Sequence, residues 1–199
     1  MLKGSVAVLD VGSSKITALT GERGVNGTFV INGMAEASYD GFSEGQFFNA
    51  SAFKDAVNSA VKSLNYSLLK SANKIFVGVP AAFIRLENKK YRLSLGKKRK
   101  IKRRDIDDLF NAGKDKVAAS GYEIVYSSDV YFTLDDNRRV LDPIGNVSSV
   151  LGGFVCYQLC ETYFTSLVRS ALAEFKLGSV EFIYEGYTEG KYLASRASS

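Results

Sequence analysis

The sequence predicts an α/β protein with mixed sheets, in which one strand-rich unit is inserted into another. Three short apolar segments near the N-terminus, separated by glycine-bearing turns, are typical of consecutive strands. After residue 80 the pattern changes to long alternating stretches around one helical segment. The chain has 199 residues, a length that suits one or two domains. The change in pattern therefore predicts two folding units.

The first unit is expected to have the element order strand-strand-strand-helix-strand. Its strands are expected at residues 5–9, 16–20, 28–33 and 74–79. The helix is capped by Asn49 or Ser51. Its apolar positions have helical spacing: Phe53, Val57, Ala60, Val61 and Leu64. Pro80 ends the last strand, and about 80 residues thus form one layer with an apolar face.

The inserted unit is expected to be a strand-helix-strand-strand module. Its strands are expected at residues 83–95, 122–134 and 150–160, with turns at 135–139 and 142–146. Asp105 is expected to cap its helix, which Gly121 stops. The chain then returns with a helix at 162–175, a strand at 180–184 and a helix at 188–196. These elements predict one unit from residues 1–84 with 162–199, and an inserted unit from 85–161.

The composition excludes several kinds of catalytic site. The sequence contains no histidine, so the chain by itself cannot form a Ser-His-Asp triad, a Cys-His nucleophile or a His-ligated zinc site. Its two cysteines, Cys156 and Cys160, lie four apart in an expected strand. Strand geometry places them about 13 Å apart, too far for a disulfide, so we expect reduced thiols.

The sequence also predicts a soluble, cytosolic chain. Asp10 interrupts the N-terminal segment too early for a signal peptide. No apolar run approaches the roughly 18 residues that a spanning helix needs. Attachment to a membrane through a partner stays possible.

The positive charge is concentrated in one segment. The formal net charge is +5, from 26 basic and 21 acidic residues. Ten of the basic residues and no acidic residue lie between Lys89 and Arg104, so the other 183 residues carry a net charge of −5. Residues 89–104 are called the basic run below.

Three interpretations of the basic run are open. It is a solvated strand end in which lysines guard an exposed sheet edge. It binds an acidic protein or an anionic lipid surface. It binds nucleic acid, but only Tyr91 is aromatic within it, so the run offers no platform on which bases could stack. The last point makes us expect no nucleic-acid partner.

One loop near the N-terminus has the residues of a phosphate-binding turn. Asp10-Val11-Gly12-Ser13-Ser14-Lys15 joins two expected strands. Gly12 allows close approach, Ser13 and Ser14 offer hydroxyl and backbone donors, and Lys15 supplies a positive charge. Asp10 could hold a hydrated magnesium ion. The same residue types are also typical of an ordinary hairpin turn.

This loop resembles the first phosphate loop of the actin-like ATPase superfamily, in the version of the bacterial cell-division protein FtsA. The resembling segment runs from Val8 to Glu22. Further short motifs resemble the same family: Phe76-Val77-Gly78-Val79-Pro80, Arg85-Leu86-Glu87-Asn88 and Leu141-Asp142-Pro143-Ile144-Gly145. The order and spacing of these motifs cover nearly the whole chain, and we take it to be the N-terminal half of such a protein.

The resemblance implies a fold and a set of roles. The fold is actin-like, or ribonuclease H-like, with subdomain 1C of the SHS2 type (residues 85–161) inserted into subdomain 1A. Gly12, Ser13, Ser14 and Lys15 would contact the phosphates of ATP, and Asp10 would reach magnesium through water. The family binds ATP with at most weak ATPase activity. Its place is the cytoplasmic side of the cell membrane at the division septum.

The resemblance also implies partners. Division proteins and neighbouring copies would bind subdomain 1C, whereas FtsZ and the membrane would be reached through regions outside this chain. The second phosphate loop, the adenine contact and the water-activating acidic residue are likewise expected beyond its end. We therefore expect weak or absent ATP binding by the chain alone.

Two alternatives stay open for the whole chain. One is a stand-alone interaction adaptor that makes no use of nucleotide. The other is an ATP-binding protein of pilus assembly, because such proteins look similar in this half. Residues 142–145 favour the division protein over the pilus protein.

Overall fold

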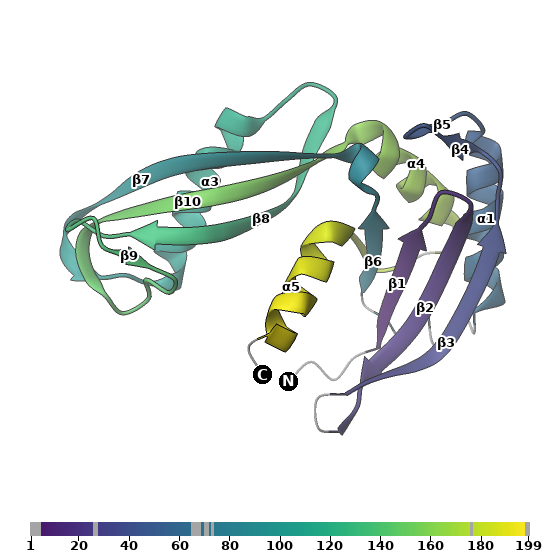
Figure 1. Cartoon of the computed structure of the whole chain (residues 1–199), viewed down its shortest axis with the longest axis horizontal. Helices are drawn as coiled ribbons and strands as arrows, with labels where there is room; N and C mark the ends of the chain where they lie inside the picture. The colour runs from purple at the N-terminus through teal and green to yellow at the C-terminus, as the bar shows by residue number, and fades with distance from the viewer. Residues whose placement is uncertain are drawn as a thin grey trace. The chain divides into compact units, whose positions relative to one another are not determined.

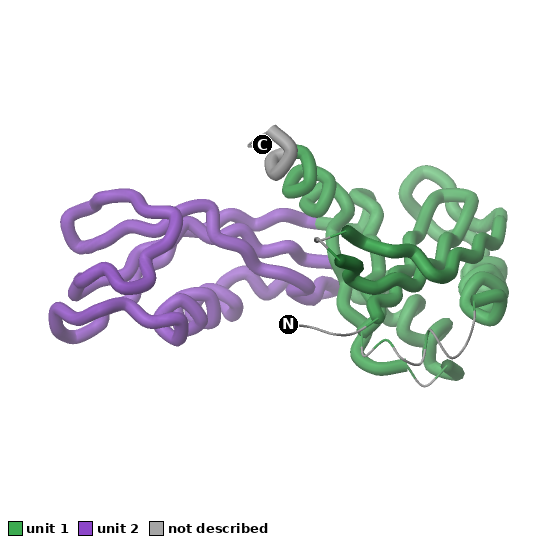
Figure 2. The backbone as a smooth tube through the Cα atoms, turned by 90° about the horizontal axis from the view of Figure 1, so that it is seen from below, with its two compact units in different colours: residues 1–84, 161–199 green, residues 85–160 purple. Residues whose placement is uncertain are grey.

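A computed structural model describes residues 5–25, 28–64, 69, 72, 74–175 and 177–197, the last four of these by backbone only (Figure 1). The chain divides into two compact units (Figure 2). Unit 1 comprises residues 1–84 and 161–199, and unit 2 comprises residues 85–160. The sequence analysis placed the second boundary one residue later.

Unit 1 is built on a five-stranded mixed sheet in the order β11-β6-β1-β2-β3. Its strands are β1 (Val6–Val11), β2 (Lys15–Arg23), β3 (Phe29–Ser38), β6 (Lys74–Val79) and β11 (Ser179–Tyr184). The first three strands form an antiparallel meander, while β6 runs parallel to both β1 and β11. The carboxyl ends of β1, β6 and β11 therefore lie at the same edge of the sheet.

The apolar face of this sheet is covered by helices α1 (Ala50–Ser63) and α4 (Thr162–Leu172) (Figure 1). The side chain of Asn49 caps α1 by accepting a hydrogen bond from the N–H of Ala52 at 3.0 Å. Alternate strand residues meet the buried side of the helices, and the core includes Leu9, Ile16, Val77, Phe53, Val57, Phe164 and Val168. The predicted helix period and strand alternation thus produce one shared core.

The remaining elements of unit 1 are short or lie at its ends. They are the hairpin β4 (Phe42–Ser43) and β5 (Gln46–Phe47), the 3-10 turns η2 (Ala81–Phe83) and η3 (Ala173–Phe175), and helix α5 (Glu185–Ala197). Phe47 stacks on Phe83, which stacks on Phe164. These rings hold the hairpin against α4. Helix α5 begins at Glu185, three residues before the expected start.

Unit 2 is a four-stranded sheet in the order β7-β10-β8-β9, with one helix. Its elements are β7 (Ile84–Lys100), α3 (Arg103–Val117), β8 (Tyr122–Thr133), β9 (Arg139–Val140) and β10 (Val147–Glu161). Leu109 and Ile106 of α3 pack on Leu151 and Phe132 of the sheet. The predicted strand-helix-strand-strand order is present, with β9 added where only a turn was expected.

Asp105 does not cap α3 in the expected manner. Helix α3 begins at Arg103, so Lys102 is the N-cap residue and Asp105 is the third helical residue. Its carboxylate accepts a hydrogen bond from the Lys102 N–H at 2.8 Å. The side chain therefore still satisfies a backbone donor at the helix start, from inside the helix.

The predicted mixed α/β fold class is confirmed by the sheets of the two units and the helices that accompany them. Among the described helices, none is both long enough and apolar enough to span a bilayer.

Candidate phosphate site at the carboxyl edge of unit 1

The predicted phosphate loop is the turn between β1 and β2. Gly12 donates its N–H to the carbonyl oxygen of Lys15 at 3.0 Å, which closes the turn. A Cβ atom on Gly12 would lie 2.9 Å from that same oxygen, so the position requires glycine. Because the Gly12 N–H is used within the turn, it is not free to bind a phosphate. The sequence predicts a row of open N–H donors that includes Gly12, whereas in the structure the Gly12 N–H is already bonded.

The donors that stay open belong to Ser13 and Ser14. Both residues are exposed at the tip of the turn. Among the described residues, neither their N–H groups nor their hydroxyl groups have a hydrogen-bond partner. Two N–H groups and two hydroxyls at an exposed turn form a small anion-binding surface.

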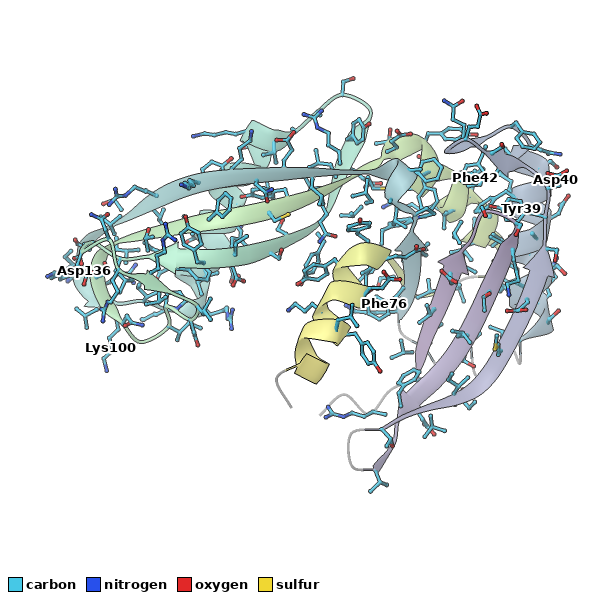
Figure 3. The ribbon with its side chains drawn as sticks, viewed as in Figure 1. Tyr39, Asp40, Phe42, Phe76, Lys100 and Asp136 are labelled. Atoms are coloured by element: carbon cyan, nitrogen blue, oxygen red, sulfur yellow. The ribbon has the colours of Figure 1, made fainter. Side chains whose placement is uncertain are left out.

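Tyr39 holds this turn in place, a role that no sequence pattern indicated. Its hydroxyl donates to the Gly12 carbonyl at 2.7 Å, and its N–H donates to the Ser14 carbonyl at 2.9 Å. Burial raises the pKa of the Tyr39 hydroxyl to about 12, so it stays a donor. Figure 3 shows Tyr39 between Asp40 and Phe42, just after β3. No motif at the loop could have revealed this contact, because it comes from a distant segment.

Lys15 is engaged by a carboxylate. Its ammonium group lies 2.7 Å from Oε1 of Glu36, and both side chains are about half exposed. The hydrogen bond from Lys15 holds the pKa of Glu36 below its usual range. An exposed pair of this kind contributes little stability. Lys15 can therefore exchange Glu36 for a phosphate at small cost.

Asp10 faces a second carboxylate from the far end of the chain. Asp10 is the exposed residue before the last position of β1, and Glu185 begins α5 directly after β11. A Cβ atom on Gly78 of β6 would lie 3.0 Å from Oε1 of Glu185 and 3.4 Å from Oδ1 of Asp10. The carboxyl ends of three strands thus bring both acids to the space above Gly78.

Within this cluster, the surroundings of Glu185 disfavour its ionised form. Its Oε1 atom is buried without a hydrogen-bond partner among the described residues. Burial, with the nearby carboxylate of Asp10, raises the pKa of Glu185 to about 7. The resemblance places the water-activating acid outside the chain, whereas the structure brings an acid from within the chain to Asp10. Residue 185 carried no sequence signal beyond following an apolar strand.

The arrangement fits a hydrated magnesium ion bound together with phosphate. The described residues contain no cluster of three or more metal-ligating side chains, so this part of the chain offers no complete metal cage. Magnesium ordinarily keeps several waters and takes one or two carboxylates plus phosphate oxygens. The carboxylate of Asp10 and that of Glu185, whose Oε1 atom has no partner among the described residues, match that donor set. The acidic pair and the serine donors lie on the same edge of the sheet.

Comparison with known proteins identifies unit 2. Residues 82–156 match the family model described as the SHS2 domain inserted in FtsA. This range contains β7, α3, β8, β9 and most of β10. No curated protein sequence matches the chain.

Comparison with solved structures identifies the overall fold. A chain of the PilM–PilN type IV pilus biogenesis complex matches with a TM-score of 0.58 at 10% identity. That match covers 96% of this chain and 50% of the other, so the present chain spans about half the length of that relative. Diol dehydratase-reactivating factor in nucleotide-free form matches with a TM-score of 0.27 at 15% identity, covering 46% of this chain and 14% of the other. The second likeness is too weak to carry an argument.

Both strong matches agree with the element order. Residues 82–156 match by sequence the SHS2 domain inserted in FtsA, and 96% of the chain matches the PilM–PilN chain in fold. The chain therefore contains a domain similar to the SHS2 domain inserted in FtsA, within an actin-like fold.

Proposed function

We propose that this chain is the N-terminal part of an ATP-binding scaffold of bacterial cell division. The observation that carries the proposal is the FtsA-type SHS2 domain inserted into an actin-like unit. In this proposal unit 1 supplies one side of a nucleotide site, and unit 2 recruits division proteins and other copies of the chain. The work takes place at the cytoplasmic side of the membrane, at the septum.

The residues of the β1–β2 turn would bind the phosphates. Ser13 and Ser14 would donate N–H and hydroxyl hydrogens to phosphate oxygens, because these donors have no other partner among the residues that the structure describes. Lys15 would leave Glu36 and pair with the phosphate. Tyr39 would keep the turn rigid through its two hydrogen bonds. A rigid turn binds an anion with less loss of entropy than a flexible loop.

The acidic pair would hold magnesium. Magnesium, when bound, compensates the negative charge of the phosphates. Asp10 would contact its water shell, and Glu185 would accept a hydrogen bond from a water or release its proton to the solvent. A divalent cation beside Glu185 would favour its ionised form and so oppose the burial and the Asp10 charge that raise its pKa. Contacts with FtsZ and with the membrane belong, by resemblance, to regions outside this chain.

The proposal is tested by the location of the chain in its own cells. A fusion to a fluorescent protein is expected to gather at the division site. Uniform fluorescence would overturn the proposal, and fluorescence at the bases of pili would favour the pilus-assembly alternative.

A charge variant separates the scaffold from an adaptor without nucleotide. Asp at positions 13 and 14 (S13D/S14D) places two negative charges where phosphate would bind, at exposed positions that leave the core intact. Because the chain alone is expected to bind nucleotide weakly, the substitution is made in a fusion of the whole protein to which the chain belongs, and we expect that fusion to lose its division-site signal. The matched control is Ser51→Asp, an exposed substitution near the start of α1. If S13D/S14D still localises like the control, the adaptor interpretation replaces the nucleotide-dependent one.

A further inference from the structure

Strand β7 has a long free edge. It is the outermost strand of the unit 2 sheet and pairs only with β10. It runs for 17 residues, whereas most strands have five or six. The regular extended backbone along this edge is interrupted at Gly96, which has φ of +76° and donates its N–H to Ser94 Oγ. Residues 88–95 therefore present an uninterrupted row of backbone groups, a template for another strand.

The two faces of this segment differ in chemistry. From residue 90 to 95, exposed and half-buried side chains alternate strictly. Tyr91, Leu93 and Leu95 are half-buried and pack against the core under α3. Lys90 and Arg92 point to the other side of the sheet. A strand beside β7 would therefore meet apolar side chains on one face and cations on the other.

Several cations on this edge are not neutralised by the residues that the structure describes, although Lys98 and Arg99 are paired with Asp135 and Asp105. Among the described residues, Lys90, Arg92, Lys97 and Lys100 have no carboxylate partner, whereas Lys89 is paired with Glu87. Unit 2 as a whole carries fifteen basic and ten acidic side chains, a net charge of +5. The same charges would repel a second copy of β7. A partner strand must therefore be acidic.

The aromatic residues of this sheet face argue against nucleic acid. Tertiary structure brings Phe154 and Tyr131 together, with ring centroids 5.5 Å apart, a pair that the basic run alone does not contain. Lys90 lies over the Phe154 ring and Arg139 over the Tyr131 ring. The chain's own cations thus occupy ring faces on which a base would stack.

We propose that residues 88–95 bind an extended peptide in which acidic and apolar residues alternate, and that the peptide adds as a further strand at the edge of the sheet. Main-chain hydrogen bonds would provide affinity, and the alternation would set the register. Acidic side chains would pair with Lys90 and Arg92, while apolar ones would extend the surface of Leu93 and Leu95. This inference rests on the proposed role of unit 2 as the recruiting domain, and it names the chemistry of the recruited segment.

The test uses the full chain and a labelled synthetic peptide of four Glu-Val repeats, with binding measured by fluorescence anisotropy. We expect saturable binding and slowed hydrogen exchange of the amides in residues 88–95. A peptide of four Lys-Val repeats should not bind. Of two Glu-Val peptides, one N-methylated at every Glu and the other at every Val, one should bind at least tenfold more weakly, because alternate amides of a strand point to opposite edges and only one set can pair with β7.

A matched pair of variants tests the location of the charge. The variant K90E/R92E is expected to weaken binding of the Glu-Val peptide at least tenfold. The control R103E/R104E makes the same change in net charge, at exposed positions in the first turn of α3, where acidic residues are tolerated. It should bind like the original chain. Arg99 is left unchanged because it pairs with the buried Asp105.

Several outcomes would overturn the inference. They are equal weakening by both variants, exchange protection outside β7, or binding that N-methylation leaves unchanged. Tight binding of an eight-residue oligothymidylate that Y131A/F154A abolishes would assign the face to nucleic acid instead. Pelleting with phosphatidylglycerol vesicles, without peptide binding, would assign it to lipid. None of these outcomes changes the cellular localisation test, so failure here and failure of the proposed function are distinguishable.

Discussion

Glu185 is part of the fold of unit 1 and also part of its candidate site. The side chain lies where β11 ends and α5 begins, beside Asp10, and its Oε1 atom has no hydrogen-bond partner in the described part of the chain. A carboxylate in this place is costly to the fold, because burial and a like charge both disfavour ionisation. Titratable groups with strongly shifted pKa values are frequent at functional sites.

This environment predicts a pH-dependent stability. The folded-state pKa of Glu185, about 7, lies above its ordinary value of 4.5. Protonation of Glu185 therefore makes its full contribution to the free energy of unfolding below pH 4.5, and this contribution is lost as the pH rises through 7. Glu185→Gln should stabilise the chain at pH 8 by about 1–2 kcal/mol, after allowance for solvent screening, and have little effect at pH 4.5. Thermal unfolding at both pH values measures this.

The control for that measurement lies on the same helix. Glu189→Gln removes an exposed carboxylate of α5 that is the smallest of the causes raising the pKa of Glu185, so at pH 8 it should raise the melting temperature much less than Glu185→Gln does. If the two variants behave alike, the carboxyl group of Glu185 is not strained.

Asp105 shows the opposite behaviour in unit 2. Two hydrogen bonds from Arg99, with one from the Lys102 N–H, lower the pKa of Asp105 to about 2. The stabilisation is therefore present above the ordinary value of 3.8 and is lost as the pH falls toward 2. Asp105→Asn should cost roughly 2 kcal/mol at pH 7, and the variant and the original should converge near pH 2.

A weakly paired carboxylate on the same helix serves as control. Asp108 lies 3.8 Å from Arg104 and is half exposed. Asp108→Asn should change the free energy of unfolding by less than about 0.5 kcal/mol. A comparable loss in both variants would contradict the assigned role of Asp105.

At the scale of elements, α3 approaches the unit 2 sheet most closely at Gly113. A Cβ atom there would lie 1.9 Å from the Tyr157 hydroxyl oxygen and 2.4 Å from the Tyr91 ring. Both side chains are fixed, since the Tyr157 hydroxyl donates to the Phe110 carbonyl and Tyr91 packs edge-on against Tyr157. Glycine therefore sets the distance between the helix and the sheet.

Gly113→Ala should destabilise unit 2 by about 2–3 kcal/mol, because either the helix or a buried tyrosine must move. Gly190→Ala in α5 is the matched control, since no atom lies within 4 Å of the added methyl group. It should be neutral or stabilise by up to about 1 kcal/mol through helix propensity. Urea unfolding of both variants measures these changes in stability. Equal effects would show that close packing is not the reason why residue 113 is glycine.

At the scale of the whole molecule, the proposed phosphate contacts come from the β1–β2 turn of unit 1. We expect little or no stabilisation of this chain by Mg-ATP, since base stacking and further phosphate contacts would have to come from elsewhere. A dissociation constant equal to the nucleotide concentration would add about 0.4 kcal/mol, or about 1 °C in melting temperature. Thermal unfolding with 1 mM Mg-ATP should therefore change by less than about 1 °C. A clear rise would contradict the prediction.

The fold was largely predictable from local pattern. Apolar alternation and helix period lie within windows of about ten residues, so the element types and the inserted module could be derived. The extent of β7, the two-residue β9 and the start of α5 could not, because pairing with distant strands decides where such elements begin and end. That Ser13 and Ser14 lie together in one turn was also predictable, since they belong to one short loop, whereas their role in binding phosphate stays a prediction.

The sequence by itself determined the two-unit organisation, the concentration of charge in residues 89–104 and the residues of the β1–β2 turn. These are properties of neighbouring residues. Tertiary structure alone decided that Glu185 meets Asp10 above Gly78, that Tyr39 holds the turn, and that the basic run lies on a free sheet edge. Each of these joins segments far apart in the chain. The physical reason is that strand order and the parallel alignment of β1, β6 and β11 are set by burial of the shared core, which no local window contains.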